Sequence, residues 1–305
     1  MRRLSYESKD LGFSFAFATA VMVVASVVLY LIFGDGTSGW QFWLMQGLYT
    51  VAIGTSAFIY AAITKTKVFA ATKLNAAPRI SHVLWGCAAV AFLVLCMSQV
   101  NALFLDWLEQ LGLGASAVEL EDNIAGLIVC ACVVPAFCEE IVFRGTVAQS
   151  LYNSNKVAAL CISGALFALY HANPAQTLHQ FVLGAFLTLL VFRSGSLWTS
   201  VIVHLFNNLF VVALSYTPLD ADDFWNLQAN DMWTLPLMIV GIIGFALCVF
   251  FYVRCTDSAW QRQDGDENTY DETESLSSKK SNSIVALIAG IVVCAILWVA
   301  QLLPR

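Results

Sequence analysis

The sequence predicts an all-α fold, a polytopic bundle of membrane-spanning helices. Of the 305 residues, 59% are apolar and only 12% are charged, whereas about 25% of residues are charged in an ordinary soluble domain. Apolar runs recur along most of the chain, many of them near the length of about 20 residues that crosses a bilayer. The nine cysteines form no CxxC pair, so neither a disulfide framework nor a zinc ribbon is expected.

Nine apolar runs are candidate transmembrane helices, of which about eight are expected to form the core. The first run is longer than the about 7 to 15 residues of a secretory signal, so it is expected to be a retained span. The fifth and sixth runs are short for a full crossing and are expected to be tucked within the bundle. The runs cover approximately residues 11–34, 42–63, 83–105, 123–143, 157–172, 178–192, 198–214, 235–253 and 283–303.

The lysine and arginine residues predict the orientation of the helices, because basic residues concentrate in cytoplasmic loops. With nine spans and a cytoplasmic N-terminus, fourteen of the fifteen basic residues lie on the cytoplasmic side, and only Arg305 lies outside. We therefore expect an integral protein of the cell (plasma) membrane with its N-terminus in the cytoplasm. Ten acidic residues then fall in the outer loops: Asp35, Asp106, Glu109, Glu119, Glu121, Asp122, Asp220, Asp222, Asp223 and Asp231.

An acidic pair, Glu139-Glu140, lies inside the fourth apolar run. One charged side chain at mid-membrane costs about 2.5 to 3.5 kcal/mol, so the pair costs on the order of 5 to 7 kcal/mol unless the fold compensates it. Arg144 follows Glu140 by four residues and shares its helix face, while Glu139 points about 100° away. Pro135 has no N–H to donate to the carbonyl four residues earlier, so the helix is expected to loosen just before the acidic pair.

Two further polar pairs lie inside apolar runs, Phe167 with His171 and His204 with Asn208. Each pair has i,i+4 spacing and therefore shares one helix face. At 1.5 Å per residue, Glu139 and the other polar residues lie about 14 to 26 Å from the cytoplasmic turns next to their helices. These side chains can therefore share one layer in the membrane interior, and we expect that layer to open toward the cytoplasmic half.

A carboxylate, two imidazoles and an amide suit a reaction in which water is the nucleophile. Glu139 would take a proton from the water as general base, while His171 holds that water. His204 and Asn208 would donate hydrogen bonds to the oxyanion that forms on a scissile carbonyl. The combination predicts hydrolysis of a peptide bond.

Three motifs in this order resemble those of the CPBP family, also called the Abi or type II CAAX protease family. They are Glu-Glu-x-x-x-Arg at 139–144, Phe-x-x-x-His at 167–171 and His-x-x-x-Asn at 204–208. The resemblance covers about residues 123–215 and implies an intramembrane glutamic endopeptidase. It implies the catalytic residues Glu139, His171, His204 and Asn208, with Glu140, Arg144 and Phe167 as supporting residues.

The chain is expected to comprise five segments. Residues 256–282 are mostly polar and cannot bury enough apolar surface to fold, which predicts a flexible acidic cytoplasmic linker. The segments are the N-terminal transmembrane helices (1–122), the CAAX-protease-like core (123–215), an outer loop with the eighth transmembrane helix (216–255), the linker (256–282) and a C-terminal accessory helix (283–305).

Two other functions would use the same residues. In a zinc metallopeptidase the Glu and His side chains would be ligands, although a His-Glu-x-x-His motif is absent and the ligands would converge from three helices. In a membrane scaffold or transporter, the polar layer would bind a partner helix or carry protons. The expected partners are a membrane-associated peptide or protein and the lipid bilayer. We expect no nucleic acid, metal or other cofactor.

The charge bias predicts the side on which each loop can be labelled. Cysteines introduced at positions 115 and 225 should react with a membrane-impermeant thiol reagent from outside, and cysteines at 70 and 270 only from inside. Labelling of 70 and 115 from the same side would contradict the number of spans.

Overall fold

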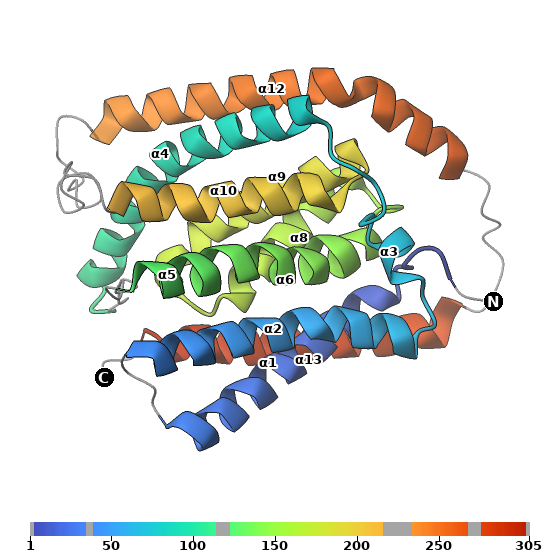
Figure 1. Cartoon of the computed structure of the whole chain (residues 1–305), viewed down its shortest axis with the longest axis horizontal. Helices are drawn as coiled ribbons and strands as arrows, with labels where there is room; N and C mark the ends of the chain where they lie inside the picture. Colours follow the sequence, from blue (N-terminus) through green and yellow to red (C-terminus); the bar gives the residue numbers. More distant parts are fainter. Residues whose placement is uncertain (1–2, 35–38, 114–122, 216–233, 268–275, 303–305) are drawn as a thin grey trace.

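The computed structural model describes residues 3–34, 39–113, 123–215, 234–267 and 276–302. This part of the chain is helical almost throughout, and most of its long helices run lengthwise along the bundle, with α1 inclined to the others (Figure 1). Eight segments of it are long and apolar enough to cross a membrane, which confirms the predicted all-α membrane bundle. The elements are α1 (Asp10–Phe33), α2 (Gly39–Ile63), α3 (Val68–Ala71), α4 (Ile80–Gln110), α5 (Ile124–Gly126), η1 (Leu127–Val133), α6 (Val134–Val142), η2 (Phe143–Val147), α7 (Ala148–Ser150), α8 (Lys156–Tyr170), η3 (Pro174–Gln176), α9 (Thr177–Ser194), α10 (Leu197–Ser215), α12 (Thr234–Glu267) and α13 (Leu276–Ala300).

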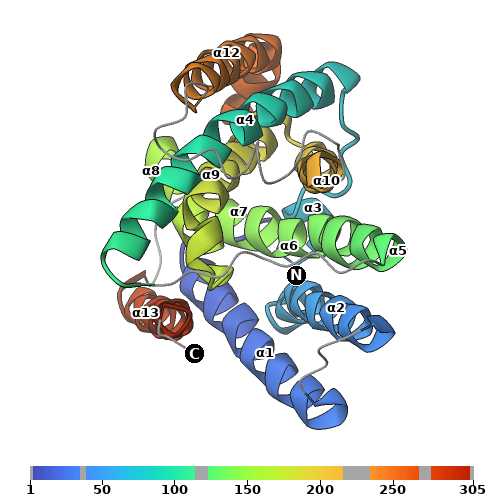
Figure 2. The ribbon, with the colours of Figure 1, turned by 90° about the vertical axis from the view of Figure 1, so that its left-hand side faces the viewer.

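The helices form three layers, which are seen from the side in Figure 1 and end-on in Figure 2. Helices α12 and α4 form one outer layer, and α1, α2 and α13 form the other. Between them lie α8, α9, α10 and the helix that runs from α5 to α7. The middle layer is therefore covered on both sides, and it carries all three sequence motifs.

The helix α8 is too short to cross a bilayer by itself. Its 15 residues rise about 22 Å, whereas the hydrocarbon core of a bilayer is about 30 Å thick. Asn155 caps its N-terminus by accepting a hydrogen bond from the N–H of Ala158 at 3.1 Å. The predicted sixth helix is longer than expected, since the segment Pro174–Ser194 has 21 residues.

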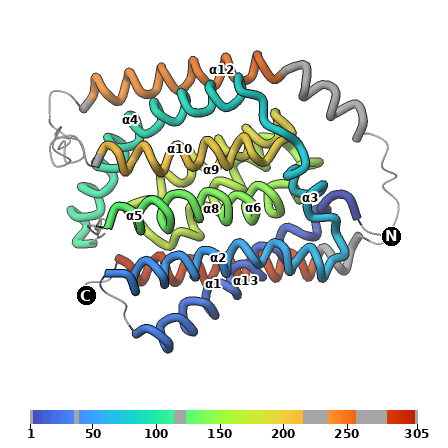
Figure 3. The backbone as a smooth tube through the Cα atoms, viewed as in Figure 1, coloured from blue at the N-terminus to red at the C-terminus, as the bar shows by residue number. Residues whose placement is uncertain are grey.

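Arg144 is buried inside the bundle, but other basic residues of the described chain gather at one end, here called the basic end and defined by Arg3, Lys65, Lys67, Lys73 and Arg193. Backbone hydrogen bonds join its loops, from the N–H of Arg3 to the carbonyl of Lys65 at 3.0 Å and from the N–H of Leu197 to the carbonyl of Lys73 at 3.2 Å. The opposite end carries the last residues of α1 and α4, the start of α2 and the turn between α8 and α9. Figure 3 shows the N-terminus at the basic end and the C-terminus at the opposite end.

The C-terminal helix α13, expected to be accessory, packs into the bundle. Gly12 of α1 allows a close approach, because an added Cβ atom would lie 1.7 Å from the carbonyl oxygen of Ser283. Cys294 is fully buried, and the indole N–H of Trp298 donates to Thr177 at 2.7 Å. Helical structure also extends into the expected linker, since α12 ends at Glu267 and α13 begins at Leu276. Residues 268–275 of that segment lie outside the described residues.

Candidate active site

The helix that carries the acidic pair is loosened just before the pair, as predicted. Its η1 segment is π-helical, and the N–H of Val134 donates to the carbonyl of Val129, five residues earlier. Pro135 cannot donate to the carbonyl of Ala131, and the side-chain amide of Asn208 on α10 donates to that carbonyl at 3.4 Å. Wide turns of this kind inside α-helices occur frequently at functional sites.

Glu140 is the acceptor at the centre of a buried polar network. Its Oε1 atom accepts a hydrogen bond from Nη1 of Arg144 at 2.7 Å and another from Nδ1 of His204 at 2.9 Å. Glu140 and Arg144 are both 0% exposed, and His204 is 2% exposed. The predicted pairing of Glu140 with Arg144 is confirmed. The contact with His204 also ties the acidic helix to α10.

Phe167, the first residue of the second motif, packs against all three neighbouring polar groups. The Arg144 guanidinium lies 4.0 Å from the centre of its ring, a cation–π contact of about 2 kcal/mol or more when both groups are desolvated. The rings of His171 and His204 pack edge-on against it, at centroid distances of 4.6 and 5.9 Å. Phe167 is fully buried, so it holds the orientation of both imidazoles.

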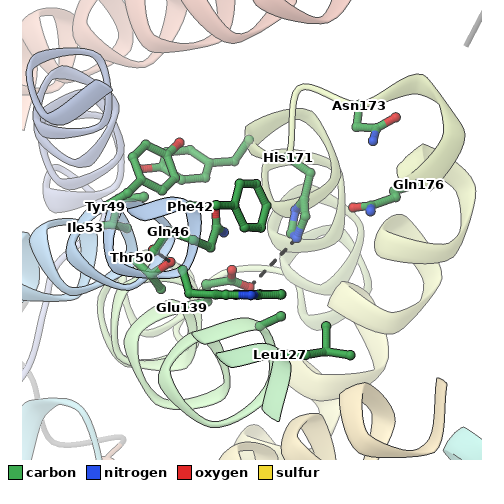
Figure 4. Close-up of a pocket in the computed structure, with 13 residues that line it drawn as sticks. Phe42, Gln46, Tyr49, Thr50, Ile53, Leu127, Glu139, His171, Asn173 and Gln176 are labelled. Carbon is green, nitrogen blue, oxygen red and sulfur yellow. Dashed lines mark hydrogen bonds and ion pairs between the residues drawn. The ribbon is translucent and has the colours of Figure 1, made fainter. Parts of the chain in front are cut away.

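Glu139 faces away from this network, toward the two histidines. Its Oε2 atom lies 3.8 Å from Nε2 of His171 and 3.9 Å from Nε2 of His204. Its side chain is 20% exposed, in contrast to the buried Glu140. Figure 4 shows Glu139 and His171 on facing helices, joined by a dashed line. Both distances exceed direct hydrogen-bond length, and they leave a gap that one water molecule can bridge.

The hydrogen-bond partners of the two imidazole rings determine which ring nitrogen carries the proton. Nδ1 of His171 lies 2.8 Å from the carbonyl oxygen of Phe167. A carbonyl only accepts, so Nδ1 carries the proton and Nε2 of the neutral ring is an acceptor. In the same way, Nδ1 of His204 donates to the Glu140 carboxylate. His204 can therefore donate from Nε2 only as an imidazolium.

The amide of Asn208 belongs to a second set of hydrogen bonds. Its Oδ1 atom accepts from Nδ2 of Asn207 at 3.0 Å, and Oδ1 of Asn207 lies 3.3 Å from Nε2 of His179. His179 and Asn207 were not predicted as site residues from the sequence. The dipeptide Asn207-Asn208 was the available signal, because its first amide also needs a partner inside an apolar helix.

A cavity of about 360 Å³ begins at Glu139 and His171. One wall is a face of α2 with i, i+3, i+4 and i+7 spacing, formed by Phe42, Gln46, Tyr49, Thr50 and Ile53. The other wall includes Asn173 and Gln176 from the turn after α8. In Figure 4 the labelled α2 residues lie beside Glu139 and His171. This role of α2 was not predicted from the sequence, although Gln46 and Thr50 are polar residues on one face of an apolar helix.

The cavity lies on the side of Glu139 that is directed toward the end opposite the basic end. Its lining residues do not extend toward the turns at 153–155 and 194–196, the side from which we expected the site to be open. Those turns are at the basic end, and Phe143 and Val147 on that side of the acidic pair are fully buried. Helical rise predicts how deep each residue lies along its helix. The direction from which that depth is accessible depends on how the helices pack.

The described residues do not present an arrangement suited to a metal ion. Within the described ranges, no group of three or more His, Cys, Asp or Glu side chains is placed to hold a metal. Nδ1 of both site histidines is engaged, by Phe167 and by Glu140, which directs Nε2 of each ring toward Glu139. Only the Nε2 atoms and the Glu139 carboxylate face one another.

Comparisons with known proteins agree with this geometry. A protein-family model, the type II CAAX prenyl endopeptidase Rce1-like family, matches residues 121–210. The Bacillus subtilis protein named "Putative membrane peptidase YdiL" is 30% identical over 93 residues, which are 30% of this chain and 38% of that protein. The chain thus matches about two fifths of the length of this curated relative. No solved structure matches the chain. These matches confirm the resemblance to the CPBP family, and the family-model match at 121–210 covers the helices that carry all three motifs.

The buried network predicts that the two glutamates differ in their effect on stability. Glu140→Ala leaves the Arg144 guanidinium without its partner, and breaking a buried pair costs about 3 to 5 kcal/mol. We expect a lower melting temperature in detergent and poor expression. Adding Arg144→Met should restore part of that stability without restoring activity.

The matched control is Glu139→Ala, which removes a partly exposed carboxylate that lies beyond direct hydrogen-bond distance of both histidines. This variant should be as stable as the native protein or more stable. An unfolded Glu139→Ala protein beside a stable Glu140→Ala protein would reverse the two roles.

Proposed function

We propose that the protein is an intramembrane glutamic endopeptidase that hydrolyses a peptide bond of a membrane-associated peptide or protein. The observation that carries this proposal is the position of Glu139, whose carboxylate lies within 3.9 Å of both histidine Nε2 atoms at the inner end of a cavity. The match to an endopeptidase family supports the same reaction class.

Glu139 and His171 are suited to activating one water molecule. The water would donate one hydrogen to the Glu139 carboxylate and the other to Nε2 of His171, which accepts because Nδ1 is protonated. Its lone pairs would then be directed toward a scissile carbonyl. As the water oxygen attacks the carbonyl carbon, Glu139 takes the proton as general base.

His204 and Asn208 are suited to stabilising the resulting oxyanion. With a neutral His204, the cluster of Glu139, Glu140 and Arg144 carries a net charge of minus one. An imidazolium balances that charge and makes Nε2 a donor, while Nδ1 stays bonded to Glu140. Asn208 has two N–H donors, one of which is used by the Ala131 carbonyl, so the second can reach an oxyanion.

Collapse of the tetrahedral intermediate completes the reaction. The bond between carbon and nitrogen breaks, and the proton held by Glu139 passes to the leaving amine. The products are two peptides, and Glu139 returns to its ionised form. Water is the only co-reactant, and no cofactor takes part. The same proposal places the protein in the cell membrane with a cytoplasmic N-terminus.

Substitution of the proposed catalytic groups should abolish cleavage without loss of the protein. Glu139→Gln, His171→Ala and His204→Ala should each lower the cleavage rate by about 10² to 10⁴, the range found for a general base or an oxyanion donor. Double variants should lose little more, because groups that act as one unit are not additive. The measurement compares peptides released from membranes that contain the native protein or Glu139→Gln, which is isosteric and uncharged.

Two alternatives give different results in the same experiments. A zinc metallopeptidase would purify with about one metal ion per chain and lose activity with a chelator. A membrane scaffold or transporter would release no peptide that depends on Glu139, and it would keep its function in Glu139→Gln if hydrogen bonding is what matters. Cleavage that survives chelators and disappears in Glu139→Gln supports the glutamic mechanism.

A further inference from the structure

The position of the cavity along the bundle indicates how a substrate reaches the candidate catalytic residues. Phe42 and Gln46 lie within the first eight residues of α2, which begins at the end opposite the basic end. Asn173 and Gln176 belong to the turn between α8 and α9 at that same end. The residues that line the cavity therefore extend from Glu139 only toward the end opposite the basic end.

The other side of Glu139 is closed by packed side chains. Ile141, Val142, Phe143 and Val147 are each at most 1% exposed. Phe143 packs edge-on against Phe167 and Tyr170, with a centroid distance of 5.1 Å to each ring. The Glu140–Arg144 pair occupies the same region without solvent exposure. A peptide has no path to Glu139 through this side.

The lining of the cavity is neutral apart from the two catalytic groups. Gln46, Asn173 and Gln176 are amides, which can both donate to and accept from a peptide backbone, and the remaining wall is largely apolar or aromatic. The connecting segments 34–38, 111–123, 171–176 and 216–233 contain no lysine or arginine. The described lining of the cavity therefore offers no lysine or arginine to a free terminal carboxylate, and the sequence predicts only Arg305 on that side.

Helix α2 is held firmly next to Glu139, although it lies outside the matched residues 121–210. A Cβ atom added to Gly54 would lie 2.7 Å from the Sγ atom of Cys138, the residue before Glu139. Gly47 likewise faces Cys130, at 3.1 Å from its Sγ atom. Glycine at these two positions lets the backbone of α2 approach the acidic helix closely, so the wall of the cavity is a fixed surface.

We infer that the substrate reaches Glu139 and His171 from the membrane face opposite the basic end, as an uncharged internal segment that lies against α2. The substrate class in this inference rests on the proposed peptidase function. The direction of access rests on the cavity alone. Because the basic end is the predicted cytoplasmic side, the substrate class is peptides and proteins with a segment at the outer face.

The direction of access can be measured with a charged, membrane-impermeant thiol reagent, sulfonatoethyl methanethiosulfonate, on sealed vesicles of both orientations. Gln46→Cys places a thiol in the cavity wall. Leu48→Cys is the matched control on the same helix, because Leu48 is 42% exposed on the bundle surface that faces lipid. Glu109→Cys and Lys67→Cys mark the opposite end and the basic end, and the native chain gives the background of its own cysteines.

We expect Gln46→Cys to be labelled only in the vesicle orientation that labels Glu109→Cys, with Leu48→Cys unlabelled in both. Labelling from the side of Lys67→Cys, or equally from both sides, would overturn the inference. Absence of labelling from either side would overturn it as well, because the cavity would then be closed to water. Gln176→Cys, on a different element, repeats the measurement if Gln46→Cys does not fold.

The substrate class has a separate readout. Some peptide termini should be present with the native protein and absent from Glu139→Gln membranes. In the substrate, these termini should map to internal, uncharged segments in the outer half of a transmembrane span or just outside it. Sites at cytoplasmic segments, or at free C-terminal carboxylates, would contradict the inference. If no end depends on Glu139, the proposed peptidase function fails, and the labelling experiment still decides the direction of access.

Discussion

The ion pair between Glu140 and Arg144 is the interaction on which the rest of the site depends. Both groups are completely buried, so each would carry a large desolvation cost without the other. In the same network, Nδ1 of His204 donates a hydrogen bond to the Glu140 carboxylate, and the Phe167 ring packs against the Arg144 guanidinium. Residues from α6, η2, α8 and α10 thereby contact one another around the ion pair, which fixes the rotation of these helices about their axes. Glu139 is directed away from the network as a result.

Two adjacent glutamates thus occupy different environments on one helix. Glu140 has its charge neutralised by hydrogen bonds, while Glu139 is partly exposed and faces two imidazole nitrogens at 3.8 and 3.9 Å. The angle of about 100° between successive residues on a helix is enough to separate them. Preorganised donors and acceptors of this kind need no rearrangement when charge develops during a reaction. Glu140, which belongs to the buried network, and Glu139, the proposed general base, are therefore adjacent in sequence but lie in different environments.

Two parts of the chain form the cavity, one inside the residues that match the family model and one outside them. The family match covers the acidic helix, α8, α9 and most of α10, and these carry the motifs. The opposite wall comes from α2, and α13 contacts the start of α9 through Trp298 and Thr177. The groups proposed for the chemistry lie in the matched region, whereas much of the surface proposed to contact a substrate lies outside it. Chains that share the motifs can accordingly differ in what they bind.

Features within a single helix were predictable from the sequence, because they depend only on helical geometry. Composition determined the membrane bundle, i,i+4 spacing determined the Glu140–Arg144 pair, and Pro135 marked the loosened turn. Helical rise also brought Glu139, His171 and His204 into one layer. Only the tertiary structure decided that His204 bonds to Glu140, that α2 forms the cavity wall and that the cavity extends away from the basic end. These features depend on which helices are neighbours and how each is rotated, and a helix that is apolar on all sides carries little sequence information about either.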